Sequence, residues 1–437
     1  MNRCRRIVDQ FLYRACVDRR LAMLGTALGP RSLVTLFAGA GGADVGLKDA
    51  GWDGKLMVEY NPVAAETLVA AREQGFIDGE VINGDVSRVD YTPWRGVGLL
   101  WSSFPCQGYS QAGKGKGIKD ERDGWPMTVR AIDQLQPRWF IGENSSGLAR
   151  GKQKCTLANV MLADLKKRFP YADYRVLSAA DYGVPQKRER VILVAGPRPI
   201  QWPKPTHVEI TDEMRKAALV RDHGYSPDDD LDEAIIESGY DDPEGLDVEI
   251  MEDLAKRGLK PFVTLAEALG FDTRIDRFEP LAAGMRRPEF IAQSADMFGV
   301  SGNEAGYLFD AMIDQYQCRI CDLQPQYCRC DESNFYEVLG SPAPTVLAGL
   351  KKGGGGGAGR RGVMTASKRM RDKMDATFEM LGERSGYSPA EAAAIQGFPP
   401  GYPFQGTAEY ELFGQIGNAV PPKLAEVIAR AVAEADQ

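Results

Sequence analysis

The sequence has 437 residues, of which 43% are apolar and 26% are charged, as in ordinary globular proteins and unlike disordered or fibrous ones. This length suggests about two or three domains. No apolar run is long enough for a membrane span, and no signal-peptide pattern follows the arginines near the start, so we expect a cytoplasmic protein. The only two histidines, His207 and His223, argue against a Ser-His-Asp triad or a histidine-rich metal centre, which leaves acid–base chemistry to other side chains.

The net charge of −8 is unevenly distributed along the chain. Between Glu209 and Asp253, 17 acidic residues stand against 3 basic ones, a local charge of −14 that leaves +6 for the rest. We interpret this acidic insert as a solvated, poorly ordered segment. The alternative is a region that mimics or repels a polyanion.

The pattern of apolar residues predicts a surface helix over residues 3–24 and then an α/β domain. Short apolar runs at 33–37, 55–58, 97–102, 139–142, 174–177 and 190–194 alternate with amphipathic stretches. Such alternation predicts a mostly parallel, doubly wound sheet with helices on both faces, over about residues 30–200. Near the end, the apolar stripe of Leu424, Val427, Ile428 and Val432 predicts a helix that begins at Pro421-Pro422.

A glycine-rich turn, Phe37-Ala38-Gly39-Ala40-Gly41-Gly42, follows the first expected strand. Glycines at such a junction let a ligand approach the backbone, and Glu59 after the next strand can accept bonds from ribose hydroxyls. Asp85 ends a third segment and can hold an adenine amino group. These features favour a nucleoside-containing cofactor, either a dinucleotide or S-adenosylmethionine.

Four further motifs lie at expected strand or helix ends. Phe104-Pro105-Cys106-Gln107 brings a thiol to the mouth of the crevice and leads into a mobile, basic loop at 113–117, while Gly142-Glu143-Asn144-Ser145 brings a carboxyl group to the same edge. Gln186-Lys187-Arg188-Glu189-Arg190 leads into a strand, and Gly417-Asn418-Ala419-Val420 leads into the last helix. Taken singly, each has an ordinary structural explanation, such as an inert cysteine or a salt-bridged turn.

In this order, the five motifs resemble those of the cytosine-C5 DNA methyltransferase family, over about residues 30–205 and 336–437. The resemblance implies a DNA (cytosine-5-)-methyltransferase of the kind found in restriction-modification systems, which uses S-adenosylmethionine and acts on double-stranded DNA. It also implies a Rossmann-like methyltransferase domain completed by the C-terminal helix, with a smaller, irregular target-recognition domain. We expect a monomer associated with the nucleoid.

The resemblance assigns roles to individual residues. Cys106 is expected to add to C6 of a flipped-out cytosine, Glu143 to hold its N3 edge, and Arg188 and Arg190 to complement that carboxylate. The expected cofactor-binding residues are Phe37, Ala38, Gly39, Gly41, Gly42, Glu59, Tyr60, Asp85, Val86, Pro105, Asn418, Ala419 and Val420.

Two departures from the family pattern keep alternatives open. Ser145 stands where the family usually has valine, and Gly124-Trp125-Pro126-Met127 replaces a Gly-Thr-Leu-Phe-like segment. A variant donor group is therefore one alternative to plain methyl transfer. The others are a catalytically silent DNA-binding homologue, an RNA cytosine methyltransferase and a nicotinamide-dependent oxidoreductase.

We divide the chain into four parts: a basic N-terminal helix (1–30), the catalytic domain (31–205), the acidic insert with the target-recognition domain (206–335) and a return to the catalytic domain (336–437).

A cysteine cluster falls in the third of these parts, in the segment that matches no family motif. The spacing of Cys318, Cys321, Cys328 and Cys330 predicts a four-thiolate structural zinc that stiffens the recognition domain, with four unligated thiols as the alternative.

Overall fold

The computed structural model describes residues 28–105, 124–150, 153–222, 226, 246–264, 267–268, 343–344 and 388–437. The expected helix over 3–24, Cys106 with the basic loop that follows it, and the four clustered cysteines lie outside these residues. Their predictions therefore stay predictions.

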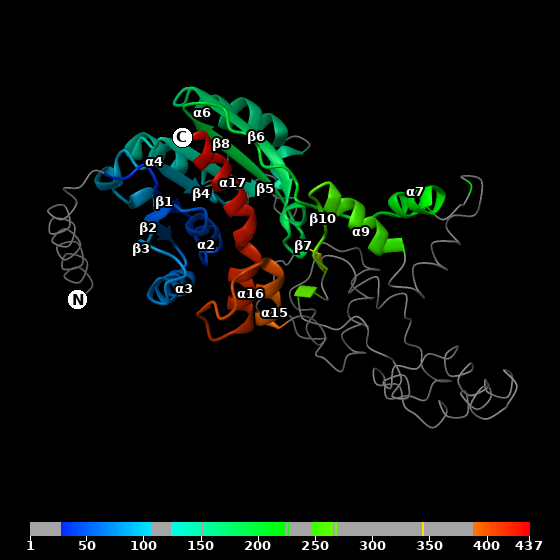
Figure 1. The fold of residues 1–437 in the computed structure, drawn as a ribbon. Helices are drawn as coiled ribbons and strands as arrows, with labels where there is room; N and C mark the ends of the chain where they lie inside the picture. The colour runs from blue at the N-terminus through cyan, green and yellow to red at the C-terminus, as the bar shows by residue number, and fades with distance from the viewer. Residues whose placement is uncertain are drawn as a thin grey trace, which may run out of the picture.

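A seven-stranded sheet forms the centre of the described chain (Figure 1). Its strand order is β3 (Glu80–Asn83), β2 (Asp53–Glu59), β1 (Ser32–Leu36), β4 (Leu99–Ser102), β5 (Trp139–Ser145), β8 (Glu189–Gly196) and β6 (Tyr171–Ser178). The neighbouring strands β3, β2, β1, β4 and β5 run parallel to one another, whereas β8 is antiparallel to both of its neighbours, β5 and β6. The mostly parallel, doubly wound sheet is thus confirmed, with one strand reversed.

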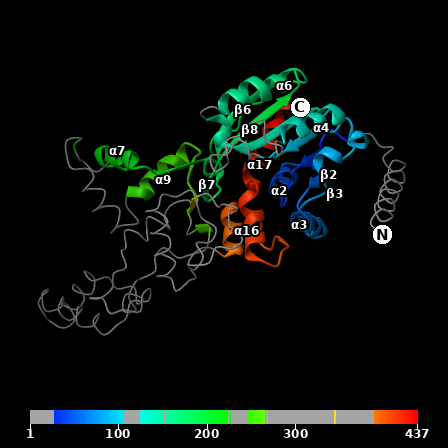
Figure 2. The ribbon, with the colours of Figure 1, turned by 180° about the vertical axis from the view of Figure 1, so that it is seen from behind.

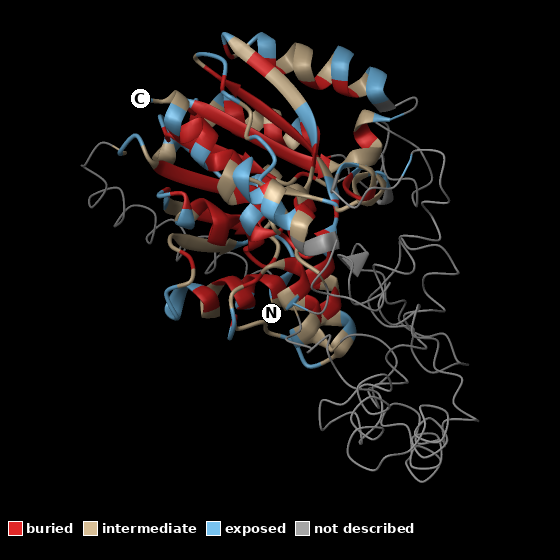
Figure 3. Cartoon of the chain, turned by 45° about the vertical axis from the view of Figure 1, so that its right-hand side comes forward, coloured by how far each residue is buried: buried red, intermediate tan, exposed pale blue. Residues whose placement is uncertain are grey.

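Helices cover both faces of the sheet, as Figure 2 shows from the opposite side. On one face, α4 (Trp125–Leu135) and α6 (Leu162–Lys166) pack on β1, β4 and β5, with α5 (Gln153–Thr156) and the π-helical turn η5 (Leu157–Met161) before α6. On the other face, α2 (Gly42–Asp49) and α17 (Pro422–Ala435) bury Trp101, Trp139 and Ile141. The central strands are accordingly buried from both sides (Figure 3), which explains their continuous apolar runs.

The last helix completes the domain, as expected. Leu424, Ile428 and Val432 are fully buried, while Val427 is partly buried against the same core. The backbones of α2 and α17 are in close contact, because a Cβ added at Gly46 would collide with the carbonyl oxygen of Pro422. Side chains from the start of the domain also bind α17, as where the Arg31 guanidinium donates to the carbonyl oxygen of Ala433 at 3.1 Å.

The remaining elements are short. Helix α3 (Pro62–Glu73) covers β2 and β3, while α15 (Pro389–Gln396) and α16 (Glu409–Asn418) pack together before α17. Short turns η1 (Val86–Arg88), η2 (Thr92–Trp94), η4 (Ser146–Ala149) and η6 (Ala179–Tyr182) link the strands. Two small parallel pairs join β7 (Gln186–Lys187) to β11 (Ala343–Pro344) and β9 (His207–Val208) to β10 (Lys260–Pro261).

The acidic insert departs from our expectation at both of its ends. Helices α7 (Asp212–Asp222) and α9 (Leu246–Lys256) pack on each other and bury Ala218, Leu219, Ile250 and Leu254. A solvated, poorly ordered segment was therefore the wrong interpretation for these parts, because charge density hid a few apolar residues at helical spacing that make a small core.

Candidate functional site

Most of the predicted site residues meet at one edge of the sheet. Leu36, at the end of β1, is in register with Val58 of β2 and Ser102 of β4, while Glu59 pairs with Asn83 and Ser102 with Gly142. Parallel strands end at the same edge, so the segments after them are neighbours. The reversed β8 brings its beginning to this edge, since Arg190 is opposite Ser145.

The glycine-rich turn is built around Glu59. Phe37, Gly39 and Gly41 have positive φ angles of 54°, 57° and 83°, which tighten the chain between β1 and α2. The Glu59 carboxylate accepts the N–H groups of Gly39 and Asn61, each at 2.7 Å. Burial raises the pKa of Glu59, although these hydrogen bonds oppose the rise.

The turn before α17 packs directly on the glycine-rich turn. A Cβ added at Gly42 would collide with the carbonyl oxygen of Val420, so only glycine allows this approach. Ala419 and Val420 are buried, whereas Asn418 at the end of α16 is exposed. Of these three predicted cofactor residues, Asn418 alone presents its side chain to solvent.

The other predicted cofactor residues differ in what they expose. The Tyr60 ring follows β2 and is 75% exposed, while Val86 is buried at the start of η1. Asp85 caps η1, with Oδ1 accepting from the N–H and hydroxyl of Ser87 at 2.8 and 2.7 Å, and these bonds lower the pKa of its carboxyl. Oδ1 is thus engaged by the protein itself.

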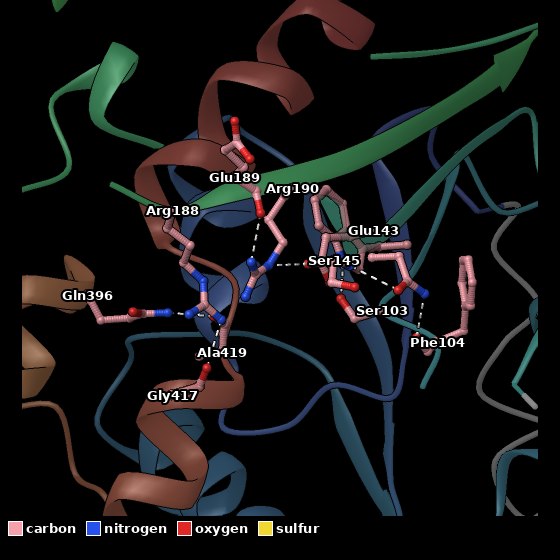
Figure 4. Close-up of polar contacts among 12 residues, drawn as sticks. Ser103, Phe104, Glu143, Ser145, Arg188, Glu189, Arg190, Gln396, Gly417 and Ala419 are labelled. Carbon is pink, nitrogen blue, oxygen red and sulfur yellow. Dashed lines mark hydrogen bonds and ion pairs between the residues drawn. The ribbon is translucent and has the colours of Figure 1, made fainter. Parts of the chain in front are cut away.

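A short ion pair links two of the predicted catalytic residues (Figure 4). The Arg190 Nε atom is 2.9 Å from Oε1 of Glu143, and both side chains are largely buried. Next to them, Asn144 donates from Nδ2 to the carbonyl oxygen of Phe104 at 3.1 Å. This bond fixes β5 to the segment Phe104-Pro105, which leads directly into Cys106.

Trp125 supports the same segment and gives a structural meaning to the altered motif at 124–127. Its ring packs edge-on against the ring of Phe104, with 5.3 Å between the ring centroids, and its Nε1 donates to Oδ2 of Asp164 at 3.2 Å. Gly124 is close to Pro105, which an added Cβ would displace. A bulky tryptophan therefore braces the chain just before the predicted nucleophile.

Arg188 does not join the pair of Glu143 and Arg190. Arg188 is 1% exposed, and its guanidinium donates to the carbonyl oxygens of Gly417 and Ala419, at 2.7 and 3.1 Å (Figure 4). These contacts place the Arg188 side chain against the turn before α17 and not beside Glu143, where we expected it, and its part in catalysis stays a prediction. Arg188 holds the turn before α17 in place.

Two buried glutamines that we gave no role reinforce this turn. Gln186 donates from Nε2 to Oε1 of Gln396 at 2.7 Å, and Gln396 in turn donates to the carbonyl oxygen of Ala419. Both glutamines are 0% exposed. Asn144 was likewise given no role of its own, although it stands in the motif at 142–145, where a run of polar residues ends an apolar central strand.

The helix that follows the glycine-rich turn also contains a buried carboxyl group. Asp44, in the first turn of α2, is 4% exposed, and burial raises the pKa of its side chain to about 6. Within the described ranges there is no cluster of three or more metal-ligating side chains and no helix long and apolar enough to cross a bilayer.

Comparison with known proteins gives consistent matches. The profile for C-5 cytosine-specific DNA methylases matches residues 32–227 and 360–434, more than half of the chain. The chain is 39% identical over 165 residues to the Type II methyltransferase M.PspPI of a Psychrobacter species, a match that covers 37% of this chain and 39% of that protein. It is 33% identical over 196 residues to the Type II methyltransferase M.AquIA of a Picosynechococcus species, which covers 40% of this chain and 77% of that protein.

These alignments leave much of several relatives unmatched. With M.Eco47II of Escherichia coli, for example, the chain is 35% identical over 198 residues and covers 46% of that protein.

Proposed function

Because this chain belongs to the C-5 cytosine-specific DNA methylase family, we propose that it is a DNA (cytosine-5-)-methyltransferase. In this proposal it transfers a methyl group from S-adenosylmethionine to C5 of a cytosine flipped out of duplex DNA. The observation that carries the proposal is the ion pair of Glu143 and Arg190 at the sheet edge where Phe104-Pro105 leads into Cys106. The relatives named as Type II methyltransferases suggest a role in restriction-modification.

The chemistry follows from the weak nucleophilicity of cytosine C5. The Cys106 thiolate adds to C6, and the electron pair of the C5–C6 double bond moves to C5. When bound, S-adenosylmethionine would supply an electrophilic methyl group: the bond from C5 to the methyl carbon would form as the bond from that carbon to the sulfonium sulfur breaks, with S-adenosylhomocysteine as the leaving group. Loss of the C5 proton to a base then restores the double bond, as the bond between C6 and sulfur breaks and the thiolate is regenerated.

Glu143 and Arg190 support the attack on C6. Oε1 of Glu143 is engaged by Arg190, so Oε2 is the oxygen directed to the N3 edge and amino group of the base. A hydrogen bond or proton at N3 stabilises the charge that develops as sulfur adds. In this arrangement the Arg190 guanidinium donates to the O2 atom of the base. Arg188 does not contact the base but holds the turn that contains Gly417 and Ala419.

The residues around the glycine-rich turn fit S-adenosylmethionine. An ionised carboxylate has about four acceptor positions, and the N–H groups of Gly39 and Asn61 do not fill all of those of Glu59, which leaves room for a ribose hydroxyl. The exposed Tyr60 offers a ring face for the adenine, and Asn418 offers an exposed amide at the end of α16. Gly39 and Gly41 let the cofactor approach the backbone closely.

A matched pair of cysteine variants tests this function. Tritium transfer from labelled S-adenosylmethionine to unmethylated DNA of mixed sequence should fall at least about a thousandfold in Cys106→Ala, since the nucleophile is lost. Cys155→Ala removes an exposed thiol in α5 and should keep the activity. On DNA made with 5-fluorocytosine in place of cytosine, the wild type and Cys155→Ala should be trapped covalently. Transfer by Cys106→Ala at the wild-type rate would contradict the proposal.

We also propose that Cys318, Cys321, Cys328 and Cys330 hold one structural zinc ion. Cys-x-x-Cys at one end and Cys-x-Cys at the other supply four thiolates, a set that leaves no open position for catalysis. Metal analysis of the purified full chain should give about one zinc per chain, and Cys318→Ser with Cys321→Ser should abolish it. Cys4→Ser is the control, and zinc content that survives the double substitution would overturn the assignment.

A further inference from the structure

The hydroxyl group of Ser145 has no partner among the residues that the structure describes. Its Oγ atom is buried from solvent and makes no hydrogen bond to any residue that the structure describes. The backbone of the same residue is satisfied, since its N–H donates to Oδ1 of Asn144 at 2.9 Å. A buried hydroxyl in this condition costs stability, so its presence calls for an explanation in ligand binding.

Ser145 occupies a specific place beside the ion pair of Glu143 and Arg190. It is the last residue of β5 and lies directly opposite Arg190 of β8. Side chains two residues apart on a strand share a face, and so do directly opposed residues. The carboxylate of Glu143, the guanidinium of Arg190 and the hydroxyl of Ser145 are therefore on one face of two adjacent strands.

The charges of the pair determine what the hydroxyl can add. Glu143 supplies acceptors and Arg190 supplies charged donors, and the two are already joined at 2.9 Å. Ser145 adds an uncharged donor on the side of the guanidinium. An acceptor atom of the substrate that approaches Arg190 thus comes within reach of a second donor.

We propose that the Ser145 hydroxyl donates a hydrogen bond to the O2 atom of the flipped cytosine, next to Arg190. This inference rests on the proposed function and adds a substrate-contacting residue to it. Addition of the thiolate to C6 moves electron density towards N3 and the conjugated O2, so a donor at O2 acts more strongly in the transition state than in the ground state. The unpartnered hydroxyl is then a group held ready for the base.

The pair Ser145→Thr and Ser145→Val isolates the hydroxyl, because threonine and valine have the same shape. We expect kcat for tritium transfer to mixed-sequence DNA to be about tenfold higher in Ser145→Thr than in Ser145→Val, the effect of one hydrogen bond. Ser145→Ala should lose about tenfold relative to the wild type. The KM for S-adenosylmethionine should be the same in all of these proteins.

A base analogue locates the contact at O2. In DNA made with 2-thiocytosine, sulfur replaces O2 and is a weak acceptor. On this DNA the wild type and Ser145→Ala should differ by less than about twofold, since the bond that the variant lacks is already weak in the wild type. An equal tenfold loss on both DNAs would overturn the assignment to O2, as would a higher KM for S-adenosylmethionine as the main effect.

Stability separates this role from a structural one. Removal of an unpartnered buried hydroxyl should leave the unfolding temperature of Ser145→Ala equal to that of the wild type or above it, while activity falls. A lower unfolding temperature with unchanged kcat would show a structural role and overturn the inference. If the wild type transfers no methyl group and forms no adduct, the proposed function fails as well; an active wild type with equally active variants overturns only the role of Ser145.

Discussion

At the scale of single residues, buried polar groups divide into those that the protein satisfies and those that it leaves for a ligand or a proton. Gln186 donates to Gln396, and Gln396 donates to a backbone carbonyl group, as Arg188 does through its Nη2 atom. Asp44 belongs to the second kind, because burial raises the pKa of its carboxyl from 3.8 to about 6. Its negative charge is therefore a cost that the folded protein carries at neutral pH.

The pH dependence of stability should reveal this carboxyl. The folded pKa lies above the unfolded one, so the native state binds the proton more tightly, and stability is lost as the pH rises from about 4 to about 6. A shift of this size corresponds to at most about 3 kcal/mol. Asp44→Asn should raise the free energy of unfolding in urea by up to this amount at pH 8, with little change at pH 4.

Asp53→Asn, at an exposed strand end, controls for the general loss of a negative charge. An equal effect of both substitutions, or a gain for Asp44→Asn that does not depend on pH, would contradict this account.

At the scale of helices and strands, the sequence patterns predicted where the strands lie along the chain but not in which direction each strand runs in the sheet. Apolar runs located β1, β2, β4, β5, β6 and β8 within a few residues. The central strands β1, β4, β5 and β8 need such runs because both of their faces are buried, whereas β6 lies at the sheet edge and is partly exposed. The reversal of β8 was not predictable, since an apolar run reads alike in either direction. Yet this reversal is what brings Arg190 to Glu143.

In the candidate site, too, local sequence patterns identified some residues, whereas contacts between distant parts of the chain could not be predicted. Glu59, Asp85 and Glu143 could be recognised because each polar residue follows or ends an apolar run, where ligands bind in open sheets. The role of Arg188 could not, because its partners Gly417 and Ala419 lie 229 and 231 positions away and no local pattern records such a contact. The unpartnered state of Ser145 likewise depends on the full packing around it.

The contact of α2 with α17 gives a prediction at this scale. Gly46→Ala should lower the free energy of unfolding by about 1–3 kcal/mol or more, since the new Cβ collides with the carbonyl oxygen of Pro422 and must push the helices apart. Gly414→Ala in α16 is the control, because a Cβ there meets nothing within 4 Å and alanine favours helix by about 1 kcal/mol. Urea unfolding measures both, and equal stability of the two variants would contradict the close packing.

At the scale of the whole molecule, charge is divided between a basic body and the acidic insert. The insert carries −14 between Glu209 and Asp253, against +6 elsewhere. If DNA is the substrate, the insert repels it at long range, and salt screens that repulsion.

Asp228→Asn with Asp229→Asn should therefore tighten binding to mixed-sequence duplex DNA by a few-fold at about 50 mM salt and hardly at all at about 500 mM. Glu66→Gln with Glu73→Gln removes two charges from exposed positions on α3 and is the matched control. Fluorescence anisotropy of labelled DNA gives both affinities. The same gain in both double variants would point to net charge rather than to the insert.

The attachment of α17 to the first strands also constrains how the protein is made. Arg31 and Ala433 are hydrogen-bonded across 402 positions of sequence, so a ribosome must synthesise nearly everything between them before the contact can form. Until then, the nascent sheet presents Trp101, Trp139 and Ile141 to water on the face that α17 will cover. Such distant contacts slow folding, and an uncovered apolar face invites aggregation. Yield in cells should accordingly respond to chaperones that shield nascent chains.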